Sequence, residues 1–213
     1  QYVDASYAGG DSDGTEAKPW TTLAAGIGAA TANSDVALAA GQYAGATVTK
    51  PVRSVGSCAG EVTIVGSGGS SALWVQSDVA AEGVSFTGDF GVYVLSGSLS
   101  LTQVRVHDTD GIAVYVTSGA SAVLSGVLVE NAVSTAVLAL GAELTVRDSV
   151  VRDTQTDVDG YFGRGVAAEQ DDSGSPSQLL IERSRIERNH DIGVFAFGSQ
   201  LTVVDSLVRD TFP

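Results

Sequence analysis

Residues 92–106 decide the fold, and they read Val-Tyr-Val-Leu-Ser-Gly-Ser-Leu-Ser-Leu-Thr-Gln-Val-Arg-Val. Apolar side chains recur at every second position in three short runs, at residues 92–94, 99–101 and 104–106. Polar residues and a glycine separate the runs. Alternation with a period of two is typical of half-buried strands and does not fit an amphipathic helix. The stretch therefore predicts three short strands joined by tight corners.

The same pattern repeats along the chain after about residue 60. In the third run of each repeat, one apolar position recurs at spacings of 22, 20, 22, 23, 35 and 22 residues. These positions are Ile64, Phe86, Val106, Leu128, Val151, Ile186 and Val208. The second run recurs in step, at Leu101, Val123, Val146, Ile181 and Val203. Three strands per repeat of about 22 residues predict a solenoid with three parallel sheets.

We therefore predict an all-β fold, a single-stranded right-handed parallel β-helix of about seven or eight coils. Val, Leu and Ile are expected to point inward, with Gly, Asn, Asp and Ser at the corners. Residues 1–213 are expected to form one domain. Residues 1–35 supply a strand, a polar loop and a capping helix, and residues 36–213 supply the coils. The helix is expected at residues 23–30, with Thr21 or Thr22 as its N-cap.

The charge limits the partners of this domain. Among 213 residues, 25 are Asp or Glu and 11 are Lys or Arg, which leaves a formal net charge of −14. Such a surface repels phosphate backbones, so nucleic acid is not expected as a partner. Polar residues interrupt every long apolar run, so no membrane insertion is expected. One cysteine, Cys58, cannot build an intrachain disulfide framework.

Several stretches resemble a known family. Residues 2–6 read Tyr-Val-Asp-Ala-Ser, and residues 9–23 read Gly-Gly-Asp-Ser-Asp-Gly-Thr-Glu-Ala-Lys-Pro-Trp-Thr-Thr-Leu. Ala-Gly-Gln-Tyr and Lys-Pro-Val-Arg-Ser-Val-Gly follow. They resemble the N-terminus of pectin-lyase-like right-handed β-helix proteins of bacterial surfaces. Residues 159–165 resemble coils of secreted repeat proteins common in myxobacteria and their relatives. The resemblance implies a secreted or cell-surface location, but no single activity, since the superfamily includes lyases, hydrolases and adhesins.

One coil of 35 residues carries two insertions, at residues 155–164 and 170–177. Asp157 and Asp159 lie in the first, and Asp171 and Asp172 lie in the second. Ca²⁺ takes several oxygen ligands, so these four carboxylates are candidate calcium ligands, and calcium is the one cofactor considered. The resemblance implies that a lyase would combine Ca²⁺ with a base such as Arg164. No catalytic motif of the superfamily matches, so no catalytic residue is assigned. Solvated acidic loops are the alternative.

A column of side chains along the first run of each coil is expected to point outward, because its neighbours are apolar and point inward. Its members are Trp74, Tyr93, Tyr115, Leu138, Ala167 and Phe195. The aromatic members, with Tyr161 of the first insertion, are candidate carbohydrate-binding residues, because stacked rings form platforms for sugars or for another protein. The alternative is that the rings only stabilise the sheet.

Charged residues near one corner alternate in sign, and we expect ion pairs between neighbouring coils. They are Asp108, Glu130, Asp153, Arg188 and Asp210, beside His107, Arg152, Glu187 and Arg209. At the end of the sequence, no capping element follows Phe212 and Pro213. An open final rung predicts either continuation of the chain or end-to-end stacking into homo-oligomers or filaments.

Three functions remain open from the sequence. We favour a non-catalytic structural or adhesive β-helix, with a polysaccharide or another surface protein as its partner. A carbohydrate-binding module that uses the outward aromatics is the first alternative. A calcium-dependent polysaccharide lyase is the second, and it rests on the superfamily and on Asp157, Asp159 and Arg164.

Overall fold

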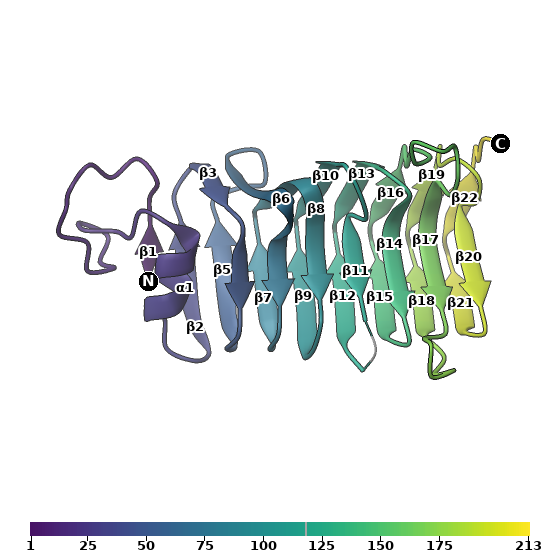
Figure 1. The fold of residues 1–213 in the computed structure, drawn as a ribbon, viewed down its shortest axis with the longest axis horizontal. Helices are drawn as coiled ribbons and strands as arrows, with labels where there is room; N and C mark the ends of the chain where they lie inside the picture. The colour runs from purple at the N-terminus through teal and green to yellow at the C-terminus, as the bar shows by residue number, and fades with distance from the viewer. Residues whose placement is uncertain (118) are drawn as a thin grey trace.

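The computed structural model describes residues 1–117 and 119–213 and shows a rod of stacked coils with a short helix at its N-terminal end (Figure 1). The strands of adjacent coils pair in parallel, and they form a 9-stranded and a 13-stranded sheet. The predicted all-β, right-handed parallel β-helix is confirmed. The larger sheet contains two columns of strands, because two long strands bend across a corner and join them. The predicted three columns of strands are therefore present.

We name the columns sheets A, B and C. Sheet A contains β1 (Tyr2–Val3), β2 (Ser34–Leu38), β5 (Val52–Gly56), β7 (Val79–Glu82), β9 (Ser98–Thr102), β12 (Ser121–Ser125), β15 (Glu143–Arg147), β18 (Gln178–Glu182) and β21 (Gln200–Val204). Sheet B contains β3 (Gly41–Ala44), the first halves of β6 (Val62–Val75) and β8 (Ser85–Val94), β10 (Arg105–Thr109), β13 (Leu128–Ala132), β16 (Val150–Arg152), β19 (Arg185–Glu187) and β22 (Leu207–Arg209). Sheet C contains β4 (Ala46–Val48), the second halves of β6 and β8, β11 (Val114–Val116), β14 (Thr135–Leu140), β17 (Arg164–Glu169) and β20 (Val194–Phe197).

The register corrects two predicted positions in one coil. Val106 pairs with Val129 rather than Leu128, and Leu101 pairs with Leu124 rather than Val123. Val129 and Leu124 are buried, whereas Leu128 and Val123 point outward and stay partly exposed. The prediction was wrong here because consecutive apolar residues hide the alternation that marks the inward face.

The corners use residues with positive φ at equivalent positions. Where sheet A turns into sheet B, Gly83, Gln103 and Gly126 have φ of 62°, 52° and 63°. Where sheet B turns into sheet C, Asn131 and Asp153 have φ of 55° and 59°. Gly, Asn and Asp tolerate this left-handed conformation, which accounts for their predicted place at corners.

The first coil is covered by the helix α1 (Leu23–Ala29), as predicted. Thr22 is the N-cap, and its hydroxyl accepts a hydrogen bond from the Ala25 amide at 3.2 Å. Leu23 and Ile27 are buried against the first strands. No helix of the described residues has the length and apolar character needed to span a bilayer.

The last coil, formed by β20, β21 and β22, exposes apolar side chains in this structure. Leu201, Val203 and Val208 are each between 39% and 43% exposed, whereas their register partners on β18 and β19 are buried. Association through this coil stays a prediction.

Candidate functional site

Three aromatic side chains stack on the outer face of sheet C, and we call Trp74, Tyr93 and Tyr115 the aromatic ladder. They occupy the same register position on β6, β8 and β11. The Trp74 and Tyr93 ring centroids lie 4.5 Å apart, and those of Tyr93 and Tyr115 lie 5.0 Å apart. The flanking Leu73 and Val75 are buried, so the alternation turns the rings outward, as predicted. Each ring is half-buried.

The aromatic ladder forms the floor of a groove of about 270 Å³. Gly69, Ser71, Phe90 and Ile112 supply the rest of the lining, together with Val92. Gly69 belongs to a Gly-Ser segment that interrupts the register of β6, and its amide donates a hydrogen bond to the Asp89 carboxylate. The Phe90 ring lies over Gly111, where a Cβ atom would collide with it. Gly69 and Phe90 form the wall of the groove, and these two contacts fix their positions.

A second hollow continues the groove on the other side of Trp74. It has a volume of about 190 Å³ and is lined by Gly45, Ala46, Thr47, Ser70, Ser71 and Trp74. Thr47 pairs with Trp74 in the register of sheet C, so it stands one coil before the aromatic ladder. The two hollows together follow the axis of the rod, and Ser71 and Trp74 line both.

Beyond Tyr115 the column continues in register but loses its ring stack. Leu138 and Ala167 follow Tyr115, and Phe195 comes next. The Arg164 side chain lies along β17 to reach Glu169 at 2.8 Å. Its guanidinium carbon lies 4.1 Å from the centroid of the Phe195 ring. Phe195, predicted to join the same platform, therefore packs on an arginine and not on the aromatic ladder.

Tyr161 stands apart from the aromatic ladder as well. It is 67% exposed on the first insertion and lines a hollow of about 380 Å³ with Phe162, Arg164 and Asp191. Phe162 has φ of 63° and lies 5.0 Å from the Arg164 guanidinium. The five predicted carbohydrate-binding residues thus divide into the aromatic ladder and a separate cluster around Arg164.

The four predicted calcium ligands do not meet. The first insertion leaves one end of β17 and the second leaves the other, so they lie on opposite sides of the rod (Figure 1). Asp157 accepts hydrogen bonds from the amides of Asp159 and Tyr161, at 3.0 and 2.8 Å. Asp171 accepts from two amides of its own turn, Ser173 and Ser175.

The second insertion also holds Asp172. Within the described residues, no three His, Cys, Asp or Glu side chains are grouped to hold a metal ion. The expectation that the two loops gather their carboxylates around one ion is therefore wrong, because a six-residue strand, about 17 Å long, separates them.

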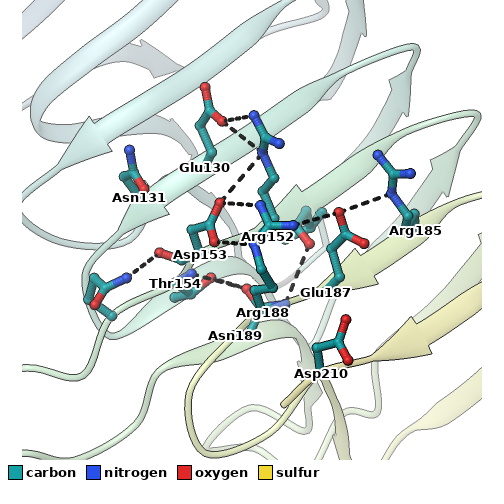
Figure 2. A network of polar contacts seen from close by, with 12 residues as sticks. Glu130, Asn131, Arg152, Asp153, Thr154, Arg185, Glu187, Arg188, Asn189 and Asp210 are labelled. Atoms are coloured by element: carbon teal, nitrogen blue, oxygen red, sulfur yellow. Dashed lines mark hydrogen bonds and ion pairs between the residues drawn. The ribbon is translucent and has the colours of Figure 1, made fainter. Parts of the chain in front are cut away.

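The charged column on sheet B forms the predicted ion pairs between neighbouring coils (Figure 2). Glu130 accepts from Arg105 and Arg152, both at 2.8 Å from their Nε atoms. The register places Glu130 opposite His107 and Arg152, not in the corner column predicted for it, which Asn131 occupies. Burial by itself raises the pKa of Glu130, but the hydrogen bonds from Arg152 and Arg105 outweigh it and lower that pKa.

Glu187 lies deeper in the same column and is 2% exposed. Arg209 donates to it at 2.8 Å, and Arg185 and Arg188 lie 3.2 and 3.0 Å away. The hydrogen bonds from Arg209 lower the pKa of Glu187, assisted by the charges of all three arginines. A general acid needs a raised pKa, so Glu130 and Glu187 have the opposite of what glycoside hydrolysis requires.

The electrostatic surroundings of the aromatic ladder are acidic. Burial raises the pKa of the Tyr115 hydroxyl, and the negative charges of Asp172 and Glu169 contribute in the same direction. No lysine or arginine lines the groove in the part of the chain that the structure describes. The groove therefore combines apolar rings and hydroxyl groups with a negative surrounding field.

The groove wall was not predicted from the sequence. Phe90 and Ile112 each lie three residues before a ladder residue, Tyr93 or Tyr115, but both fall outside the alternating runs, so the pattern did not mark them as part of the outer face. One signal was present, since four polar or glycine residues at 67–70 interrupt an otherwise strand-like run. A loop that departs from a regular solenoid is where binding surfaces tend to form.

No protein-family model matches the sequence, and none of the curated proteins matches it. Solved structures do match. A pectin methylesterase variant in complex with a hexasaccharide has a TM-score of 0.60 at 12% identity, covering 100% of this chain and 92% of that chain. The pectin methylesterase PemA from Erwinia chrysanthemi has a TM-score of 0.59 at 13% identity, with the same coverage. An alginate lyase from Paenibacillus has a TM-score of 0.53 at 12% identity, covering 88% and 96%. At these identities the likeness establishes the fold alone.

Proposed function

We propose that this chain is a non-catalytic extracellular β-helix that adheres to polysaccharide through the aromatic ladder. The observation that carries the proposal is the groove on sheet C, where three consecutive coils each present one half-buried ring. Parallel strands stack about 4.8 Å apart, so a chain that runs along the rod meets one ring at each coil. Sugar rings have apolar faces that suit this platform.

The alternative role of the rings is to stabilise sheet C by stacking on one another. Their centroid distances show that they do contact each other. Stacking of the rings does not explain why Gly69 and Phe90 line one side of the groove beside them. A concave apolar surface with a few hydroxyl groups is typical of a small-molecule or glycan site.

The structural neighbours support a glycan-binding function without establishing it. Two of the pectin methylesterase structures contain bound hexasaccharides, so the same scaffold carries glycans in other proteins. Adhesion outside the cell also fits the strongly acidic, regular solenoid and the resemblance of its N-terminal residues to surface proteins. A lyase is the competing function, because a pectate lyase and an alginate lyase share the fold.

The experiment is affinity electrophoresis of the whole chain in gels that contain single polysaccharides. We expect retardation by at least one of them, and a weakening of binding of about tenfold in each of Trp74→Ala, Tyr93→Ala and Tyr115→Ala, since truncating a central aromatic contact costs about this much. Leu180→Ala is the matched control, because Leu180 is an outward, half-exposed residue on β18 of sheet A.

Retardation that persists in all three ladder variants would leave the rings with a stabilising role only. The same polysaccharides are incubated with the protein, with and without Ca²⁺, and followed by ultraviolet absorbance. A rise from unsaturated uronide products would contradict the non-catalytic assignment and favour the lyase.

A further inference from the structure

We infer that the aromatic ladder takes uncharged glycan chains and rejects polyuronates. The inference rests on the proposed function and names its ligand class. It differs from the ligands named for the structural neighbours, which are pectin, pectate and alginate. The few cationic residues of the chain lie away from the aromatic ladder, and this placement favours uncharged ligands.

The coils that carry the aromatic ladder are almost without cations. Between Arg53 and Arg105, and again between Arg105 and Arg147, the sequence contains no lysine or arginine. Arg53 and Arg147 lie on β5 and β15 of sheet A, and Arg105 lies on β10 of sheet B. Arg53 pairs with Glu82, and Arg105 pairs with Glu130. None of the three belongs to the sheet that carries the aromatic ladder.

The first arginine on sheet C is Arg164, two coils beyond Tyr115. Its guanidinium is already engaged, because it lies 2.8 Å from a Glu169 oxygen and 3.8 Å from an Asp191 oxygen. The Phe195 ring covers it at 4.1 Å. Two carboxylates around one guanidinium leave this cluster with no net positive charge to offer an acidic sugar.

The fixed charges near the groove are negative. Asp89 holds the Gly69 amide at the groove wall, and the charges of Asp172 and Glu169 act on the Tyr115 hydroxyl. A uronate carboxylate that entered this groove would lose its hydrating water and would contact apolar rings with no cation nearby. This uncompensated desolvation costs free energy. The formal net charge of −14 adds long-range repulsion at low salt.

An uncharged sugar meets none of these penalties. Its apolar face can lie on the rings of Trp74, Tyr93 and Tyr115, and its hydroxyl groups can exchange hydrogen bonds with the Tyr hydroxyls and with Ser71. Neighbouring coils at Thr47 and Leu138 extend the same face in both directions. The structure thus favours a linear, uncharged chain that follows the axis of the rod.

The test measures binding to two groups of polysaccharide by affinity electrophoresis, at low and high salt and with EDTA present. Xyloglucan, mixed-linkage β-glucan and galactomannan represent uncharged chains, and polygalacturonate and alginate represent polyuronates. We expect at least one uncharged chain to bind through the aromatic ladder, and both polyuronates to bind at least tenfold more weakly at low salt.

A variant tests the charge argument directly. Leu138→Lys places a cation next to Tyr115 on sheet C, and Val123→Lys places the same charge on the outer face of sheet A as the matched control. We expect Leu138→Lys to gain polygalacturonate binding at low salt and Val123→Lys to gain none. Equal gains in the two variants would show that the local surroundings of the aromatic ladder do not decide the preference.

The remaining outcomes separate this inference from the proposed function. Polyuronate binding that equals binding of uncharged chains, and that is lost in Tyr93→Ala, would overturn the inference and leave the glycan-binding function standing. Polyuronate binding that appears only when Ca²⁺ replaces EDTA would also overturn the inference, since the carboxylates would then bind through the ion. Absence of binding to every polysaccharide in both groups would overturn the proposed function and the inference together.

Discussion

Glu187 is a carboxylate enclosed at the surface of sheet B, only 2% exposed and surrounded by three arginines. Most surface ion pairs contribute little, because water competes for both partners. Glu187 differs because burial removes the water that would hydrate its carboxylate, so the arginines must stabilise its ionised form. The sequence suggested only weak pairs here, since the burial of one partner cannot be read from alternating charge.

The variant Glu187→Gln is expected to lower the free energy of unfolding by about 1 to 2 kcal/mol, because three cations would surround a neutral side chain. The value is moderate because the arginines are themselves partly exposed. Chemical denaturation measures it, and Glu143→Gln at an exposed position of β15 is the matched control. An unchanged midpoint in Glu187→Gln would show that the cluster contributes nothing net.

The same residue gives the wild-type protein a pH dependence. The pKa of Glu187 is lower in the folded protein than its ordinary value of 4.5, as is that of Glu130. Their stabilising contribution is therefore complete above about pH 4.5 and is lost as the pH falls through the lowered pKa values. The stability difference between wild type and Glu187→Gln should shrink over that acidic range. A difference that stays constant down to pH 2 would contradict the assigned direction.

The corner between sheets A and B offers a test of backbone conformation alone. A Cβ atom at Gly126 would have open space around it, with the nearest neighbouring atom, the Gln103 amide nitrogen, 4.0 Å away, but φ is 63°. Gly126→Ala should therefore destabilise by about 1 kcal/mol through backbone strain. Gln103→Gly, at the equivalent corner of the previous coil, should change stability in the opposite direction. Thermal unfolding of both variants measures this, and a shift of the same sign would refute the explanation.

At the scale of elements, the sequence predicted one aromatic platform, but the structure has two separate groups. The strands β14 and β17, which carry Leu138 and Ala167 in the column, lie between the aromatic ladder and Phe195. The column through Trp74, Ala167 and Phe195 was predicted correctly, because alternation fixes which side chains face outward. What each ring touches could not be predicted. The Phe195 ring packs on Arg164, which also donates a hydrogen bond to Glu169 on its own strand, and alternation gives no sign of either contact.

The variant Phe195→Ala is expected to separate the two groups. It removes the ring that covers Arg164 at 4.1 Å, so stability should fall by about 1 kcal/mol. Glycan binding should stay within twofold of wild type, because Phe195 does not line the groove of the aromatic ladder. Affinity electrophoresis beside Tyr93→Ala measures the contrast. A loss of binding equal to that of Tyr93→Ala would join Phe195 to the platform.

At the scale of the whole molecule, the sequence repeat predicts most of the fold. Three alternating runs per period predict the columns of strands and most of the inward residues, and the separate helical pattern at residues 23–30 predicts the cap of the first coil. The errors arose where the repeat carries little information. Runs of consecutive apolar residues shifted the predicted register at Val123 and Leu128, and the two insertions were predicted to lie together although β17 holds them apart. Insertions obey no period, so their position in space depends on which end of a strand they leave.

The most direct test of the account is the fluorescence of Trp74 when a glycan is added. The chain has two tryptophans, and Trp20→Phe leaves Trp74 as the reporter within the groove. Titration of this variant with an uncharged oligosaccharide, chosen from the chains that bind in electrophoresis, should shift the Trp74 emission to the blue and saturate, because a sugar that stacks on the ring displaces water. Tyr93→Ala in the same background should weaken the titration by about tenfold. Binding detected by calorimetry without any change in Trp74 emission would place the glycan elsewhere and contradict the central claim.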